Sequence, residues 1–243
     1  MLADSGWTEK IFAYCERGDD PSFWAEPLNA WSNAAFWVAA AGFAVALVIH
    51  RDRLREGAAS GSFASPTGPA ARDLWLLVVL LIGIGAGSFL FHTFAEPWSG
   101  MADVGCIVLW VLWYLWVSAR RVLRWGRGFA AGALVVHLAL SVLLLMATGW
   151  FLMSYLPTAA AAYLLALHAA RFPLPGREAL LGSAVTFTVS MVMAGLDRPL
   201  CDLIPTGTHF VWHLLNAAAL LLASLGLMKN VQQPAQRVTP HAA

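Results

Sequence analysis

Seven long apolar runs constrain the fold of this chain more than any other feature of its sequence. A helix needs about 20 mostly apolar residues to cross the hydrocarbon core of a bilayer. The fourth and fifth runs are nearly continuous, and Thr148-Gly149 offers a break between them, so we expect a tight helical hairpin there. The runs cover residues 28–49, 74–94, 101–119, 129–148, 150–170, 179–196 and 208–228. The sequence therefore predicts an all-α, polytopic membrane protein with a seven-transmembrane helix bundle.

Composition and charge agree with a bundle in lipid. Only 12% of the residues are charged and 59% are hydrophobic, whereas a soluble domain carries about 25% charged residues. A net charge of +1 gives no basis for nucleic-acid binding, and no obligate protein partner is evident. We expect one membrane domain over residues 1–230, with residues 1–27 as its extracytoplasmic N-terminal segment. A disordered cytoplasmic tail over residues 231–243 would follow.

The placement of basic residues predicts the orientation, because cytoplasmic loops are enriched in lysine and arginine. One side of the bundle holds only Lys10, Arg17 and Arg198. The loops after the first, third and fifth runs, with the tail, hold Arg51, Arg53, Arg55, Arg72, Arg120, Arg121, Arg124, Arg127, Arg171, Arg177, Lys229 and Arg237. We therefore expect the N-terminus outside the cytoplasm and the C-terminus inside. The flexible stretch over residues 56–71, rich in Gly, Ala and Ser, would be a cytoplasmic loop.

Polar residues within membrane spans are costly and mark function by default. Ser88 and His92 end the second run, Asp103 opens the third, and His209 and His213 open the seventh. In the predicted orientation, all five side chains lie near the outer face. Polar groups from three separate helices would therefore share one membrane depth, which indicates a site close to the extracytoplasmic surface.

The spacing of three histidines in this set favours a metal site. His209 and His213 are four residues apart and project from one face of a helix, and His92 lies at the same depth. Three imidazoles leave the fourth tetrahedral position open for water, as in catalytic zinc sites. The alternative is that these histidines are only interfacial. His137 and His168 lack partners at such a spacing, and we interpret both as structural.

Cys15 and Cys201 both fall outside the cytoplasm in this topology, where disulfides persist. We therefore expect a Cys15–Cys201 bond, with two unpaired thiols as the alternative. Cys106 lies within the third run and is expected to remain a buried thiol.

Three separated blocks of the chain resemble the alkaline ceramidase family, within the seven-helix membrane hydrolases that include the adipoQ-type receptors. The blocks span nearly the whole chain. They are YCE (14–16) with FWAEPLNAWSN (23–33), GSFLFH (87–92) with Asp103, and Asp197 and Cys201 with HFVWH (209–213).

The resemblance implies zinc at His92, His209 and His213, with Ser88 and Asp103 completing the active site. It also implies a calcium site in the N-terminal acidic segment, for which Glu16 and Glu26 match two carboxylates. The chain departs from the family pattern at Ala13, Tyr14 and Gly18, and Asp19 or Asp20 would have to substitute. The alternative is a solvated acidic segment that binds no cation.

The resulting hypothesis is zinc-dependent hydrolysis of the amide bond of ceramide or a similar N-acyl lipid drawn from the membrane. Zinc would lower the pKa of water to about 7, Asp103 would transfer protons, and Ser88 would stabilise the oxyanion. Ser88 as a small packing residue and Asp103 as a helix N-cap are the alternatives.

Three other functions share some of these features. An adipoQ-type receptor or sensor would have the same zinc site. A retinal protein needs a lysine inside a span, and Lys10 and Lys229 both lie outside the spans. A transporter would bind its substrate near the midplane rather than at one face.

Overall fold

The computed structural model describes residues 6–51 and 69–231, and the regular secondary structure of these ranges is entirely helical. Seven helical segments are long and apolar enough to cross a membrane, which confirms the predicted number. The first joins α1 (Pro27–Ser32) to α2 (Ala34–Ile49), and the fifth joins the short η1 (Phe151–Tyr155) to α7 (Leu156–Arg171). The others are α4 (Pro69–Phe94), α5 (Pro97–Arg121), α6 (Arg127–Thr148), α8 (Arg177–Leu196) and α9 (His209–Val231). The chain thus has the helices of a multi-pass membrane protein.

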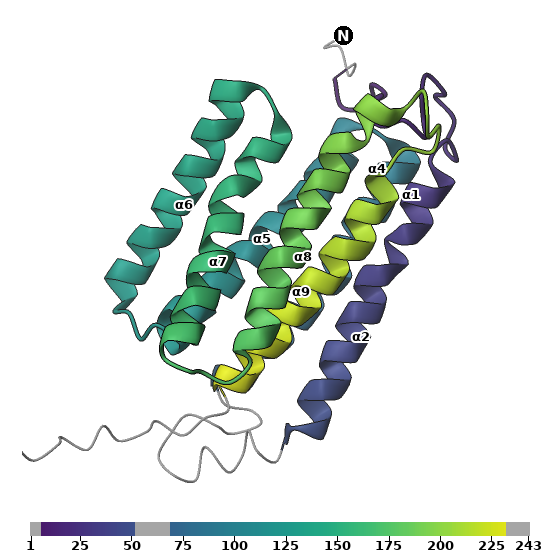
Figure 1. Cartoon of the computed structure of the whole chain (residues 1–243). Coiled ribbons are helices and arrows are strands. Elements are labelled where there is room, and N and C mark those ends of the chain that lie inside the picture. The colour runs from purple at the N-terminus through teal and green to yellow at the C-terminus, as the bar shows by residue number, and fades with distance from the viewer. Residues whose placement is uncertain (1–5, 52–68, 232–243) are drawn as a thin grey trace, which may run out of the picture.

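The helices run side by side, with α6 at one edge of the bundle and α1–α2 at the other (Figure 1). Helices α4 and α9 are the central ones, since half of the apolar window of each is buried, against 6% for α6. The main core fills the space between α2, α4, α5 and α9, and its fully buried members include Phe43, Leu77 and Leu227. Most of the predicted loop over residues 56–71 and of the predicted tail lies outside the described residues.

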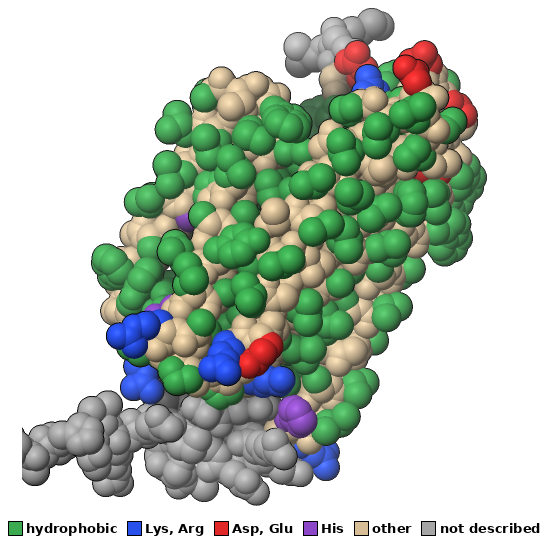
Figure 2. Space-filling view, viewed as in Figure 1, with side chains coloured by type: hydrophobic (Ala, Val, Ile, Leu, Met, Phe, Trp, Pro, Cys, Tyr) green, Lys and Arg blue, Asp and Glu red, His purple; other side chains and the backbone are tan. Residues whose placement is uncertain are grey.

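The two ends of the bundle differ in charge. Apolar side chains such as Val135, Met146 and Leu164 cover its sides (Figure 2), as expected for a surface that faces lipid. Basic side chains gather at the end where α5 finishes and α6 begins, which we call the arginine end. The N-terminal segment, residues 6–26, folds over the opposite end, and acidic side chains are visible there.

Helix α5 begins four residues before the predicted start of the third run. Pro97 occupies its first turn, and a reciprocal capping box between Glu96 and Ser99 marks the start of the helix. Asp103 consequently lies inside α5, and its alternative role as the N-cap of this span is wrong. The break between the fourth and fifth runs is confirmed, because Gly149 ends α6 in the left-handed conformation (φ 64°).

Candidate metal centre

Three histidines from two helices meet at the end of the bundle that the N-terminal segment covers. His92 lies in the last turn of α4, and His209 and His213 lie in the first two turns of α9. All three are buried, and one ligand atom from each lies within 4.8 Å of those of the other two. The ring centroids are 4.6 to 5.1 Å apart. The structure therefore brings together the three side chains that the sequence predicts as metal ligands, and we call them the histidine cluster.

The hydrogen bonds of His92 leave one of its ring nitrogens for an ion. Its Nδ1 lies 2.6 Å from Oε2 of Glu26, while its Nε2 is buried and has no hydrogen-bond partner in the described part of the chain. A buried polar atom without a partner costs about 1–3 kcal/mol, which a coordinated ion would offset. Metal-binding histidines usually donate their other ring N–H to a carboxylate, a backbone carbonyl or water, and Glu26 is such a carboxylate.

In His213, as in His92, one ring nitrogen is held by a partner outside the cluster and the other faces the cluster. Its Nδ1 lies 2.7 Å from Oγ of Ser32 in α1, and its Nε2 lies 3.5 Å from Oγ of Ser88. Ser32 in turn donates to the backbone carbonyl of Asn29 at 2.8 Å, which leaves its oxygen free to accept from Nδ1. The Nε2 atoms of His92 and His213 therefore face the centre of the cluster, and their Nδ1 atoms are held from behind.

His209 is fixed by the way α9 begins. Oδ1 of the buried Asp197 accepts from the backbone N–H groups of Thr208 and His209 at 2.7 and 2.9 Å. Asp197 thereby caps amides at the start of α9 that have no acceptor within the helix. Tyr14 stacks on the His209 ring with centroids 3.8 Å apart. Burial raises the pKa of the Tyr14 phenol well above its ordinary value, so the ring that covers His209 stays neutral. Nδ1 of His209 is buried and lacks a partner among the described residues.

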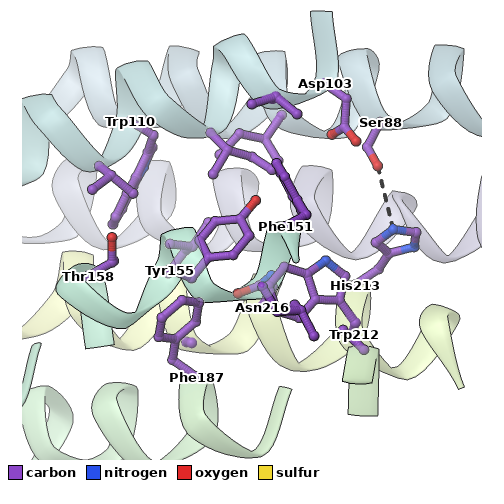
Figure 3. A pocket seen from close by; sticks show the side chains of 18 of the residues that line it. Ser88, Asp103, Trp110, Phe151, Tyr155, Thr158, Phe187, Trp212, His213 and Asn216 are labelled. Atoms are coloured by element: carbon purple, nitrogen blue, oxygen red, sulfur yellow. Dashed lines mark hydrogen bonds between the residues drawn. The ribbon is translucent and has the colours of Figure 1, made fainter. Parts of the chain in front are cut away.

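Asp103 and Ser88 lie beside the cluster, on facing helices (Figure 3). Gly87 makes this possible, because a Cβ atom there would lie 2.6 Å from the carbonyl oxygen of Ala102 and 3.1 Å from Cα of Asp103. Helices α4 and α5 thus approach closely at this level. One oxygen of Asp103, Oδ1, is buried and has no hydrogen-bond partner in the described ranges, so it is available to a bound molecule.

A cavity of about 860 Å³ opens from the histidine cluster into the bundle. Ser88, Asp103 and His213 line one end of it (Figure 3). Mostly apolar side chains from α5, α7, α8 and α9 line the rest, together with the polar Thr158, Ser183 and Asn216. Along α9 the lining continues from His213 to Ala223, a rise of about 15 Å at 1.5 Å per residue. A volume of this size is in the range of small-molecule sites, and the charged and histidine side chains of its lining lie at the end next to the histidine cluster.

The predicted calcium ligands are not brought together as a cation site. Glu16 accepts from the backbone N–H groups of Leu28 and Asn29 at 2.6 and 2.8 Å, and Asp19 is exposed. Glu26 pairs with Arg17 and His92. Within the described ranges, the histidine cluster is the group of three or more ligand-type side chains close enough to share an ion. Calcium stays a prediction that this arrangement does not support.

Most of the remaining candidates occupy the expected places. Cys15 and Cys201 form the predicted disulfide, with Cα atoms 5.3 Å apart. Cys106 is a free thiol as predicted, but it is only partly buried, so the expectation of a buried thiol is wrong. His137 lies 3.3 Å from Oγ1 of Thr158, and His168 contacts Phe172, so neither belongs to the histidine cluster. The disulfide links the N-terminal segment to the turn that precedes α9.

Sequence reasoning missed the groups behind the ligands. Glu26 was assigned to calcium, and the roles of Ser32, Asp197, Tyr14 and Arg17 were not identified. A signal for Asp197 exists in the sequence, because it is an aspartate that precedes the start of α9 by a dozen residues. Gly207 lies between them and takes the left-handed conformation (φ 63°) in the turn. Tyr14, Glu26 and Ser32 lie in the blocks that carry the resemblance, but the sequence does not show what they contact, because these contacts join segments far apart in the chain.

No model of a known protein family matches this chain, and no curated protein matches it. The function therefore has to be argued from the site.

Proposed function

We propose that this chain is a zinc-dependent hydrolase that cleaves the amide bond of ceramide or a similar N-acyl lipid. The products are a fatty acid and a long-chain amine. The observation that carries the proposal is the buried histidine cluster at the polar end of a long apolar cavity, with Asp103 and Ser88 beside it. The resemblance of the sequence blocks to the alkaline ceramidase family supports the substrate class.

The donor set favours zinc over harder cations. Imidazole nitrogens suit zinc, copper, nickel and iron, whereas calcium and magnesium prefer oxygen ligands. Three histidines are the ligand set of many catalytic zinc sites. His92, His209 and His213 would hold the ion, which would supply Lewis acidity for attack of water on an amide carbonyl.

Two side chains of the protein would do the remaining chemistry. Asp103 is buried next to the cluster and has one unpaired oxygen, so it is suited to accept the proton of the attacking water. It would then pass that proton to the nitrogen of the leaving amine. The Ser88 hydroxyl, 3.5 Å from Nε2 of His213, would donate a hydrogen bond to the oxygen of the amide as negative charge develops on it.

The shape of the cavity supports a lipid as the substrate. Its polar end holds the groups that would act on an amide, and its apolar length along α9 would hold a hydrocarbon chain. The chain of a membrane lipid is already in hydrocarbon, so its transfer into the cavity gains little hydrophobic free energy. The apolar lining would therefore accommodate and orient the chain, and the polar groups would recognise the amide. The amide would then lie close to the headgroup level while the chain remains among the helices.

The proposed placement in the membrane follows from the difference in charge between the two ends of the bundle. The arginine end is expected to face the cytoplasm, which puts the histidine cluster near the extracytoplasmic face. The Cys15–Cys201 disulfide fits that side, because disulfides persist outside the reducing cytosol.

Release of fatty acid by the purified full-length protein in detergent micelles tests the proposal. We expect hydrolysis of an N-acylated long-chain base that stops when zinc is removed by a chelator and returns when zinc alone is added back. Zinc bound by the histidine cluster without any fatty acid release from N-acyl lipids would overturn the enzyme assignment. That outcome would favour an adipoQ-type receptor or sensor, which would use the same metal site.

A further inference from the structure

Arg17 is the most completely buried charged group near the histidine cluster that the proposed chemistry does not use. Its side chain is 0% exposed. Nε lies 2.5 Å from Oε1 of Glu26, and the two terminal nitrogens donate only to backbone carbonyls. The acceptors are the carbonyl oxygens of Asp20 (3.1 Å), Ser22 (2.9 Å), His92 (3.2 Å) and Thr93 (3.5 Å).

This set of oxygens has the composition of a site for a hard cation. One carboxylate and four backbone carbonyls surround the positive charge, and carboxylate and carbonyl oxygens are the groups that bind calcium in proteins. Here the planar guanidinium lies among them. Because arginine keeps its charge at all physiological pH values, the cation is a permanent part of the chain.

The charge of Arg17 reaches the histidine cluster through Glu26. Oε2 of Glu26 accepts from Nδ2 of Asn29 at 3.1 Å and lies 2.6 Å from Nδ1 of His92. Each Glu26 oxygen therefore has a fixed partner, Arg17 at Oε1 and His92 with Asn29 at Oε2. This contact holds the Nδ1 edge of the His92 ring, which leaves the buried Nε2 facing the cluster.

We propose that Arg17 is a positioning residue of the metal centre, a built-in cation that orients Glu26 and, through it, the His92 ring. It takes the place of a second metal ion at the outer end of α4. This inference rests on the metal site of the proposed function and not on the identity of the lipid. The N-terminal segment is then part of the metal centre, because it supplies both Arg17 and Glu26.

The test measures metal binding directly, so it does not depend on hydrolysis. Zinc affinity of full-length Arg17→Ala is compared with wild type by competition with a chelator, and the cobalt-substituted proteins are compared by their visible spectra. Loss of the group that orients a metal ligand costs 10–100-fold in affinity. We expect Arg17→Ala to bind zinc on the order of 10–100-fold more weakly, with a changed cobalt spectrum. Methylguanidinium added in solution should restore both the zinc affinity and the cobalt spectrum. A purely structural role of Arg17 would not predict this rescue.

Lys10→Gln is the matched control. Lys10 lies in the same segment and pairs with Glu96 at 2.8 Å, but it has no contact with Glu26. This variant loses the same charge and should keep wild-type zinc affinity. If Arg17→Ala fails to fold, Arg17→Lys replaces it, since a lysine keeps the charge without the planar five-donor geometry and should weaken zinc binding. Wild-type zinc affinity and cobalt spectrum in a folded Arg17 variant would overturn the proposal.

Discussion

His213 offers one ring nitrogen to Ser32 and the other to the histidine cluster, and so it has no spare donor or acceptor. The His213→Ala variant should therefore lose most of its bound zinc, because two remaining imidazoles bind the ion too weakly to retain it during purification. Elemental analysis of the purified protein measures this, with about one equivalent of zinc expected in wild type. His137→Ala, a histidine outside the cluster, is the control. Unchanged zinc content in His213→Ala would exclude the assignment.

Asp103 is predicted to transfer protons and not to bind the metal. Asp103→Asn should retain its zinc but lose amide hydrolysis by about 10²–10⁴-fold, because an amide side chain cannot transfer a proton. The comparison requires zinc content and fatty acid release on the same preparation. Turnover at the wild-type rate in the variant would show that Asp103 only supports the packing of α5.

At the scale of whole helices, the close approach of α4 and α5 at Gly87 determines the geometry of the site. Gly87→Ala would place a Cβ atom 2.6 Å from the carbonyl oxygen of Ala102. The helices must then separate, which should lower the melting temperature and reduce hydrolysis together. Gly132→Ala in α6 is the control, because a Cβ there has no neighbour within 4 Å and alanine favours a helix over glycine by about 0.5–1 kcal/mol. Equal stability of both variants would contradict this account of Gly87.

The helices and the grouping of His209 with His213 could be predicted from the sequence because each depends on local information. Apolar length specifies the spans, and the spacing of His209 and His213 specifies a shared helix face. The start of α5 was placed late because Pro97 and the Glu96–Ser99 capping box lie before the apolar run. The partners behind the ligands were not predicted, because pairs such as Glu26 with His92 and Ser32 with His213 form only when distant segments pack.

For the whole molecule, the proposed orientation can be tested with the two lysines of the chain. Lys10 lies in the N-terminal segment and Lys229 near the end of α9, at opposite ends of the bundle. A membrane-impermeant amine reagent applied to intact cells should label Lys10 and leave Lys229 unmodified until the cells are opened. Labelling of Lys229 alone in intact cells would reverse the topology and would place the histidine cluster on the cytoplasmic side.

The disulfide should stabilise the whole fold, because it joins residues 186 positions apart. In the loop-entropy model a closure of this length contributes about 5 kcal/mol. Reduction, or the Cys201→Ser substitution, should therefore lower the melting temperature and loosen the segment that carries Glu26. Cys106→Ala, which removes the free thiol, should keep the sensitivity to reductant. Thermal melting with and without reductant measures both, and an unchanged melting temperature after verified reduction would contradict the expectation.

The long separation between Cys15 and Cys201 also has a consequence for biosynthesis. At about 5–20 residues per second, the ribosome needs about 10–40 s to produce the partner of Cys15. His92 is made before the midpoint of that interval, whereas His209 and His213 follow Cys201 and are the last parts of the site to be synthesised. A nascent chain that stops before residue 209 has one of the three ligands. In the proposed function, metal loading would therefore be a late event in the maturation of this protein, and a chain truncated before α9 would lack two of the three histidines of the cluster.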